Sequence, residues 1–519
     1  MDSADKGAPP RGAVSDVLEF LRRYSRERLD SRRMDERRSF STSLIPDLAS
    51  AGLFGLRIPK EYQGQELSHS DALRVMTQLG AIDANLMVLT AVHNTLGVPP
   101  VQHFAPEAVK TAILPELAQG KRLITSAISE PGMGSNLRAI STRATKQPDG
   151  SYVINGNKQW ISLGADAAYV NVFARLTNEL GQDLGITGFL VDTATSGFVG
   201  GPEVITLGLK AVPQNSLNFQ NLRVPAKSLL GVEGEGLLAA KTAFMQGRIV
   251  LAAGGLGAAM RSLELAHRFA QRREVATGNL AENGRIQQIL AECVAATQAV
   301  EALVQHIAGR LDAAEGVAEE LYFAAKILGC ELMWQVVDRS LQLLGARGFV
   351  DTNVVGQLFR DYRLFRIFEG TTEAVTVYLG TRFLAAPERL GSLLDAFNAA
   401  PQVQELATGV AKLTTAPIAD AKHRHVLANA VGELACWTIL AGLTSETSYQ
   451  SEISAHTAAW CEQRLRERLR AAERDLPFVD LPTVDAIAGH IAGFDAVIGN
   501  VEQRRPGDQH DLDVLLRRG

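Results

Sequence analysis

The sequence is poor in cysteine, and its histidines are scattered. Its 519 residues include four cysteines, Cys293, Cys330, Cys436 and Cys461, and no two of them have the C-x-x-C spacing. This indicates neither a zinc site nor a redox-active pair, and buried free thiols in a reducing cytosol are expected. The ten histidines do not cluster at ligand spacing, apart from His423 and His425 in one polar stretch. We therefore predict no metal site.

The sequence also lacks an excess of positive charge and a long apolar run. The formal net charge is −5 and the isoelectric point is near 6.1, which gives no electrostatic reason to expect nucleic acid as a partner. The polar segment Met1–Arg11 has no apolar core of the kind found in secretory signals. No stretch reads as long and apolar enough to cross a bilayer. We predict a cytoplasmic protein without a transmembrane segment.

The chain is long enough for several domains, and its pattern of predicted secondary structure changes twice along the sequence. Apolar residues recur at helical spacing in the first part, as in Asp16–Glu27 and Ser70–Leu79. Short runs rich in Val, Ile, Phe and Tyr then alternate with turn residues: Tyr152–Ile154, Tyr169–Ala174, Gly188–Val191 and Leu217–Phe219. After Gly236, segments rich in Ala, Leu, Gln and Glu predict long helices again: Leu237–Ala270, Gly284–Arg310 and Ala318–Leu344.

This pattern predicts an α+β, mainly helical protein. Residues 1–13 form a disordered tail, residues 14–122 an N-terminal helical domain, and residues 123–235 a middle domain of antiparallel strands. Residues 236–386 form a C-terminal helical domain, and residues 387–519 a helical extension that proline residues interrupt. Two glycine-rich segments, Gly231–Gly236 and Gly254–Gly257, do not predict a dinucleotide-binding fold, because neither follows a strand and opens a helix inside a βαβ unit.

Four separate stretches between residues 14 and 387 resemble the acyl-CoA dehydrogenase family. They are GLRIPKEYQG (Gly55–Gly64), SAISEPGMGS with YVINGNKQWISLG (Ser126–Ser135 and Tyr152–Gly164), NLRVPAKSLLGVEGEG (Asn221–Gly236), and QLLGARGF with RDYRLFRIFEGTT (Gln342–Phe349 and Arg360–Thr372). Their order and spacing on an α–β–α chain identify a member of that family, in a long form. The resemblance implies a β-barrel-like middle domain and a C-terminal four-helix bundle.

The resemblance also implies FAD as the cofactor. Trp160 matches a tryptophan that packs on the isoalloxazine ring, and Ser162 matches the hydroxyl residue that bonds flavin N5. The remaining matches are Ile128 and Ser129 at the pyrimidine edge, Arg273 at the adenine end, Thr371 and Glu373 at the adenosine–pyrophosphate side, and Gln342, Gly345 and Gly348 in a segment that reaches the FAD of the neighbouring subunit. Because the segment of Gln342, Gly345 and Gly348 would reach a second subunit, the resemblance implies at least a dimer.

Glu369 matches the family's catalytic base. Acyl dehydrogenation requires a carboxylate that removes a weakly acidic α-proton while a hydride leaves Cβ for flavin N5. Glu369 follows the apolar residues Ile367 and Phe368, so we expect a raised pKa. Some family members carry the base on an earlier helix, where this chain has Gly247, and Arg248 matches an arginine near the base. We assign Ser135, Phe368 and Gly370 to the substrate site.

The predicted function is FAD-dependent α,β-dehydrogenation of an acyl thioester in fatty acid metabolism. Electrons would leave to an electron-transfer flavoprotein or another acceptor. The alternatives are a flavin-dependent monooxygenase of the same fold and a catalytically silent family member.

Two departures from the family pattern bear on substrate and cofactor. Met245 replaces an acid that contacts CoA in several relatives, which suggests a thioester on a carrier protein. The segment Arg273–Thr277, REVAT, departs from the family's Arg-x-x-Phe-Gly. The extension, which in longer relatives occupies the space of a second dimer, predicts a homodimer rather than a tetramer.

Overall fold

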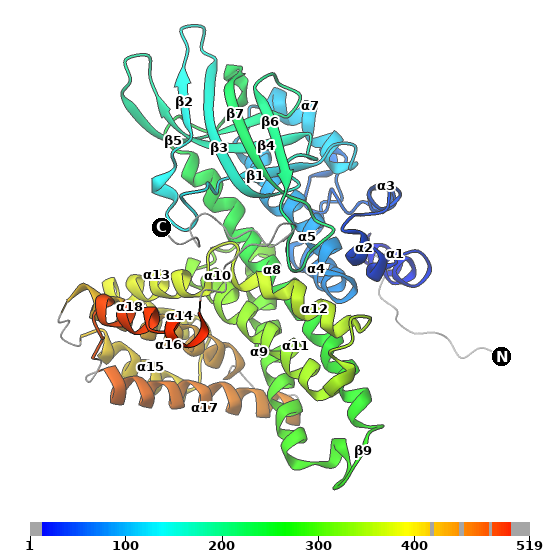
Figure 1. Cartoon of the computed structure of the whole chain (residues 1–519), viewed down its shortest axis with the longest axis vertical. Coiled ribbons are helices and arrows are strands. Elements are labelled where there is room, and N and C mark those ends of the chain that lie inside the picture. Colours follow the sequence, from blue (N-terminus) through cyan, green and yellow to red (C-terminus); the bar gives the residue numbers. More distant parts are fainter. Residues whose placement is uncertain (1–12, 416–419, 446–450, 477–479, 500–519) are drawn as a thin grey trace. The chain divides into compact units, whose positions relative to one another are not determined.

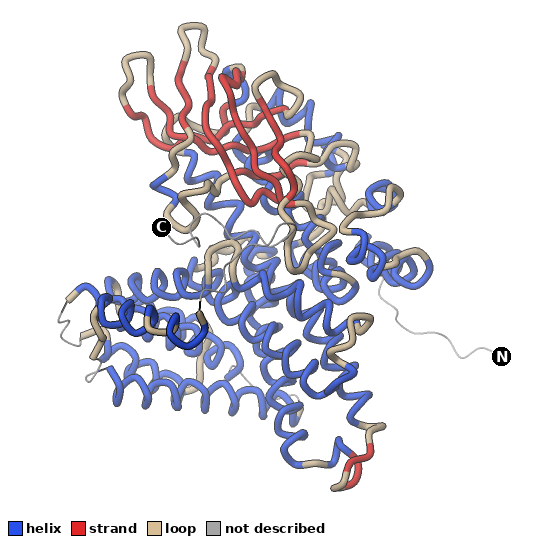
Figure 2. The backbone as a smooth tube through the Cα atoms, in the orientation of Figure 1, coloured by secondary structure: helices blue, strands red, loops and turns tan. Residues whose placement is uncertain are grey.

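The computed structural model describes residues 13–415, 420–445, 451–476 and 480–499 (Figure 1). The chain divides into two units with the boundary after Arg470. The described part of the second unit contains α18 (Val484–Ala492) and α19 (Asp495–Ile498). Most of the predicted N-terminal tail, residues 1–12, lies outside the described residues. The prediction of an α+β, mainly helical fold is confirmed: along the chain, the strands follow one helical region and precede another, and Figure 2 shows the sheet at one end of the helices.

The N-terminal region is a set of short helices, each with a local reason to begin. They are α1 (Ala13–Glu27), α2 (Ser31–Arg37), α3 (Leu44–Ser50), α4 (His69–Ile82), α5 (Ala84–Ala91), the π-helical turn η2 (Val92–Gly97), α6 (Val98–Phe104) and α7 (Glu107–Ala118). The Ser68 hydroxyl caps α4, and the Asp83 carboxylate caps α5 by accepting from the N–H groups of Asn85 and Leu86.

The middle region is an eight-stranded sheet in the order β6-β7-β3-β2-β4-β5-β8, with β1 added beside β4. The strands are β1 (Ile124–Ala127), β2 (Arg143–Lys146), β3 (Tyr152–Ser162), β4 (Tyr169–Thr177), β5 (Asp183–Asp192), β6 (Phe198–Glu203), β7 (Gln214–Val224) and β8 (Leu229–Leu230). Most pairings are antiparallel as expected, but β1 and β2 each pair with β4 in parallel. Alternating residues such as Ile154, Val172 and Leu217 fill its core.

A bundle of long helices follows the sheet. It contains α8 (Gly236–Ala270), α9 (Gly284–Asp312), α10 (Glu319–Ala324), the π-helical turn η6 (Ala325–Gly329), α11 (Cys330–Leu344), α12 (Val354–Tyr362) and α13 (Thr372–Ala385). Glycines serve the packing of α8 on α4: a Cβ at Gly257 would collide with the carbonyl oxygen of Thr77 in α4, and a Cβ at Gly80 of α4 would collide with the carbonyl oxygen of Gly254 in α8. The two helices can cross closely because these positions lack side chains.

The C-terminal extension packs on this bundle as far as Arg470. It comprises α14 (Glu388–Ala396), α15 (Pro401–Leu413), α16 (Ala421–Ser445) and α17 (Glu452–Asp475). Gly380 of α13 lies against the backbone of Ala428, and Gly432 of α16 lies against the backbone of Thr376. The two helices therefore meet through a reciprocal pair of glycines.

Two helices, α8 and α16, are long and apolar enough to cross a membrane, which corrects the expectation that no stretch has this length and composition. Of their most apolar windows, 72% and 78% are buried inside the protein. Packing in the core accounts for this apolar character. The four cysteines are buried and unpaired, as predicted (Cys293, Cys330, Cys436 and Cys461).

Candidate active site

Glu369 lies in a sharp turn between the 3₁₀ turn η8 (Arg363–Arg366) and α13. Its φ is +58° and that of Gly370 is +94°, so two successive residues occupy the left-handed region, which a glutamate rarely adopts. The turn directs the carboxylate inward: its Oε2 is buried and has no hydrogen-bond partner within the described part of the chain. A buried hydrogen-bond acceptor without a partner lowers the stability of the fold, so its presence indicates a functional site rather than a structural one.

The surroundings of Glu369 raise its basicity. Burial raises the pKa of the carboxyl group to about 7, and the positive charges of Arg248 and Lys326 oppose this increase. Arg248 lies over the ring of Phe323, with its Cζ 4.5 Å from the ring centroid. Its Nε is also buried without a partner among the described residues. The carboxylate can therefore change protonation near neutral pH.

Gly247 leaves room for this carboxylate. A Cβ atom at residue 247 would lie 3.5 Å from Oε2 of Glu369 and 3.4 Å from Cδ2 of Leu96. Residue 247, which matches the position of the base in some relatives, therefore lies next to the Glu369 carboxylate. Because it is glycine here, this position adds no second carboxylate to compete with Glu369.

Two residues that sequence reasoning missed hold the turn in place. Lys326, in η6, donates a hydrogen bond from Nζ to the carbonyl oxygen of Phe365. Glu331, in α11, accepts from Nε of Arg366 at 2.6 Å and from Oγ1 of Thr372 at 2.7 Å. The signal in the sequence that could have been used is the single lysine inside the apolar run Tyr322–Cys330.

The structure gathers a second group of predicted residues on the sheet. The N–H of Gln159 donates to the carbonyl oxygen of Ser129 at 2.9 Å, which joins the segment after β1 to β3. The register of β3 and β7 shifts between Lys158 and Ile161, and Trp160 lies in this bulge with a φ of +62°. Bulges redirect side chains, and the indole of Trp160 is left 52% exposed.

The neighbours of Trp160 are polar groups held by the sheet. Ser162 is hydrogen-bonded through Oγ to the side-chain amide of Gln214. Ile128 is buried, and its carbonyl oxygen accepts from Nζ of Lys158 at 3.0 Å. Ser135 is exposed in the loop after Met133.

A buried ion pair that sequence reasoning missed lies beneath this group. Lys158 Nζ is 2.9 Å from Oε1 of Glu130, and both side chains are almost completely buried. The hydroxyls of Ser141 and Thr142 also donate to Glu130. Bonds from several donors hold the pKa of Glu130 down to about 2 against the effect of burial. Lys158 stands at an inward position of a strand, which requires an anionic partner.

A third group of predicted residues lies elsewhere. Gln342 and Gly345 end α11 and are exposed. The next turn contacts the end of α8, where the Arg347 guanidinium lies 6.0 Å from the ring of Phe269. Arg273 immediately precedes β9 (Glu274–Val275), which lies at the end of the bundle opposite the sheet (Figure 1). This group therefore lies away from the sheet that carries Trp160.

The remaining predicted residues lie around the base turn. Phe368 packs against Phe365, with ring centroids 5.2 Å apart and the ring planes tilted by 59°. Thr371 caps α13, its hydroxyl accepting from the N–H of Ala374. Glu373, in the first turn of α13, lines a partly open cavity of about 410 Å³ between helices of the bundle and the extension.

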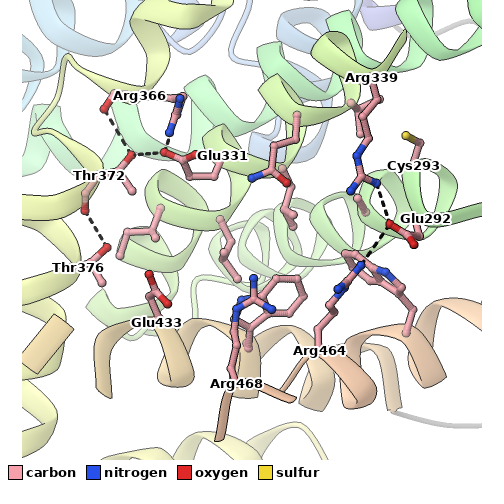
Figure 3. Close-up of a pocket in the computed structure, with 18 of the residues that line it drawn as sticks. Glu292, Cys293, Glu331, Arg339, Arg366, Thr372, Thr376, Glu433, Arg464 and Arg468 are labelled. Carbon is pink, nitrogen blue, oxygen red and sulfur yellow. Dashed lines mark hydrogen bonds and ion pairs between the residues drawn. The ribbon is translucent and has the colours of Figure 1, made fainter. Parts of the chain in front are cut away.

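Paired charges line this cavity (Figure 3). Arg366, Glu331 and Thr372 form one network, while Glu292 accepts from both Arg339 and Arg464 in another. Neither Glu369 nor Trp160 is among its lining residues. The cavity was not foreseen from the sequence, because it depends on how the extension packs on the bundle.

Comparisons with known proteins agree with this arrangement. Acyl-CoA dehydrogenase N-terminal, middle and C-terminal domain models match residues 15–121, 125–222 and 234–383. An acyl-CoA dehydrogenase of Bacillus subtilis is 31% identical over 340 residues, which cover 66% of this chain and 89% of that protein. The chain belongs to the acyl-CoA dehydrogenase family.

Other members of this family are longer or match in fold alone. The mitochondrial very long-chain specific acyl-CoA dehydrogenase of Macaca fascicularis is 29% identical over 373 residues, 70% of this chain, which span 57% of that protein. The structure of an acyl-CoA dehydrogenase complexed with FAD from Bacillus anthracis matches 95% of this chain and 92% of its own, with a TM-score of 0.77 and 22% identity. The acyl-CoA dehydrogenase fold therefore extends through most of the C-terminal extension.

The residues on the sheet fit the flavin that members of this family bind. A planar ring needs an exposed flat surface and polar groups at its edge, which Trp160 and Ser162 supply. In the loop of residues 131–135, a Cβ atom added at Gly132 or Gly134 would meet no atom of the described residues within 4 Å. The space in front of the loop is thus open for a ligand to approach the backbone.

Proposed function

We propose that this chain is an FAD-dependent dehydrogenase that forms a double bond between Cα and Cβ of an acyl thioester. The observation that carries the proposal is the buried Oε2 of Glu369, which lacks a partner among the described residues and lies beside two cationic side chains. A carboxylate with a pKa of about 7 is suited to accept a proton from carbon at neutral pH.

The protein residues then have distinct roles. Glu369 removes the α-proton and holds it on its carboxyl group, while Arg248 offsets negative charge in the site. Ser135, Phe368 and Gly370 surround the thioester arm, and Trp160, Ser162, Ile128 and Ser129 hold the flavin ring. FAD, when bound, accepts the two electrons and the β-hydrogen, so that the substrate is oxidised to the α,β-unsaturated thioester and the flavin is reduced.

The exposed group at the far end of the bundle supports a homodimer. Because Arg273, Gln342 and Gly345 lie at the end of the bundle opposite the sheet that carries Trp160, we propose that they contact the FAD of a partner chain. Next to them Phe349 is 87% exposed, and an exposed aromatic residue beside predicted cofactor contacts favours a subunit interface. Thr371 and Glu373 would contact the chain's own cofactor.

Anaerobic addition of an acyl thioester, as acyl-CoA and as the matched acyl-carrier-protein, to the purified yellow protein tests the activity. A dehydrogenase loses its flavin absorbance on substrate alone. A flavin monooxygenase of the same fold requires an external reductant and O₂, and a catalytically silent member stays unchanged or colourless. Re-oxidation by an electron-transfer flavoprotein, compared with an artificial acceptor, then identifies the class of electron acceptor.

The form of the thioester is a separate proposal. Met245 stands one turn before Arg248, and its Sδ is 3.6 Å from the Arg248 guanidinium. An apolar thioether at this place favours a substrate carried on a protein-bound pantetheine. A higher kcat/KM for acyl-carrier-protein than for the matched acyl-CoA would support this, and a strong preference for free acyl-CoA would exclude it.

A cytoplasmic location also remains a prediction.

A further inference from the structure

Lys326 is a buried cation close to the base. Its side chain has no exposed surface, and burial lowers the pKa of its ammonium group, while the charge of Glu369 acts in the opposite direction. It lies in η6, where the helix has a π-helical turn. Such turns insert a residue into a helix and are common at functional sites.

Lys326 and Glu331 hold the segment that carries Glu369 at both of its ends. On the N-terminal side, the carbonyl oxygen of Phe365 accepts from Lys326. Glu331 then joins Arg366, before the base, to Thr372, after it. Since the Glu331 carboxylate forms an ion pair with Arg366 at 2.6 Å, it adds little negative charge to the surroundings of Glu369. Lys326 and Glu331 lie in the continuous helical segment η6–α11, so this one segment holds the turn that contains Glu369 and Gly370.

The charged and titratable groups around the base come from several helices. They are Arg248 of α8, Lys326 of η6, Cys330 and Glu331 of α11, and, facing Arg248, Glu319 of α10 and Tyr378 of α13. Burial raises the pKa of Cys330, so this thiol is neutral near pH 7. Among the described residues, Arg248 and Lys326 are therefore the cations that act on the Glu369 carboxylate.

We propose that Lys326 is a positioning residue for Glu369: it anchors the turn through Phe365 and, with Arg248, supplies the positive charge that keeps the buried carboxylate ionised between turnovers. This inference rests on the proposed function, because it concerns the same base. It assigns to Lys326 both an anchoring and an electrostatic contribution, which substitutions can separate.

Three substitutions at this position test the inference. Lys326→Met removes the charge and the donor, Lys326→Gln keeps an N–H donor without the charge, and Lys326→Arg keeps the charge. Lys110→Met, at a lysine of α7 paired with Glu107, is the control. The measurement is the pH dependence of anaerobic flavin reduction at saturating acyl-CoA, with FAD content determined for each variant.

The expected result is a shift of the acidic limb of the pH–rate profile, where the rate of flavin reduction rises with pH. In Lys326→Met and Lys326→Gln this limb moves to higher pH by about one unit or more, because the positive charge that favours the ionised Glu369 carboxylate is lost. The rate at pH 7 then falls about fivefold while the plateau at high pH persists in Lys326→Gln. Lys326→Arg and Lys110→Met retain the wild-type limb.

An unshifted limb in FAD-loaded Lys326→Gln would overturn the inference. If the uncharged variants fail to fold or to retain FAD, Lys326→Arg decides, since a shifted limb in that variant contradicts an electrostatic role. Wild-type protein that no acyl thioester reduces would instead refute the proposed function. The two failures are therefore distinguishable.

Discussion

At the scale of single residues, Glu369 combines features that oppose stability. A left-handed backbone costs a non-glycine residue about 1 kcal/mol, and a buried oxygen without a partner costs a further 1–3 kcal/mol or so. Bonds from Lys326 and Glu331 to the flanking residues hold the turn against these costs. Such arrangements persist where the strained residue performs chemistry.

The first prediction concerns pH. The pKa of Glu369 is raised to about 7, chiefly by burial, and only its deprotonated form can take a proton. The rate of flavin reduction should therefore rise with pH and reach half its maximum near pH 7. Stopped-flow absorbance between about pH 5.5 and 9 measures this. A rate that is constant from pH 5.5 upwards would mean that the carboxyl group is not buried as described.

A second prediction exploits Gly247. Since a Cβ at residue 247 lies 3.5 Å from Oε2 of Glu369, a glutamate there can reach the same substrate atom once Glu369 is removed. Glu369→Gly alone should lose about two to four orders of magnitude in turnover. Adding Gly247→Glu should restore a measurable part of it, whereas Gly247→Ala in the same background should not. Equal activity of the two double variants would contradict this geometry.

At the scale of elements, close helix contacts and one bulge determine where the site residues lie. The bulge in β3 exposes Trp160, and the glycine contacts of α4 with α8 and of α13 with α16 set the helix spacing. The helix contacts depend on glycines that lack a side chain, and the bulge depends on a redirected side chain. Substituting a glycine at a helix contact should therefore change the free energy of unfolding differently from substituting a glycine on an open helix face.

The third prediction compares two glycines within helices. At Gly309 in α9 an added Cβ meets no atom of the described residues within 4 Å, so Gly309→Ala should raise the free energy of unfolding by about 0.5–1 kcal/mol through helix propensity. At Gly432 the same atom collides with the backbone of Thr376, so Gly432→Ala should lower it by about 1–3 kcal/mol. Urea unfolding followed by the fluorescence of Trp437 and Trp460, which contact each other, reports the difference. Stabilisation at both positions would show that α13 and α16 do not pack so closely.

The sequence predicted these elements better than it predicted the site. Helical periodicity located α4, and a composition rich in helix-forming residues located α8 and α9, to within a few residues. A short run rich in Tyr, Val and Ile located the start of β3. Two observations could not be foreseen because they depend on tertiary contacts. Lys158 pairs with Glu130 across 28 positions, and Lys326 bonds a carbonyl 39 positions away. Motif resemblance found Glu369, but its burial and its two cations required the fold.

At the scale of the whole molecule, the extension covers one face of the bundle. The helix α16 packs on α13, and Arg464 of α17 reaches Glu292 of α9. We therefore propose that no further subunit packs on this face of the bundle. At the opposite end of the bundle, Gln342, Gly345 and Phe349 are exposed, and we propose that a partner chain binds there.

The fourth prediction is the oligomeric state. One chain has a mass of 55.9 kDa, so a homodimer of two such chains has about 112 kDa. Light scattering of the FAD-loaded protein should give this mass. Phe349→Glu should reduce it towards that of one chain and lower the FAD content, because the partner's cofactor contacts would be lost. A mass of four chains would contradict the account of the extension.

The most direct measurement is anaerobic flavin reduction by an acyl thioester, as acyl-CoA or acyl-carrier-protein, in the wild type and in Glu369→Gln. The substitution keeps the size of the side chain and removes its basicity. Both proteins should bind FAD, the wild type should lose its flavin absorbance, and the variant should do so about two to four orders of magnitude more slowly. A variant that retains FAD and is reduced at a rate close to that of the wild type would show that Glu369 is not the base.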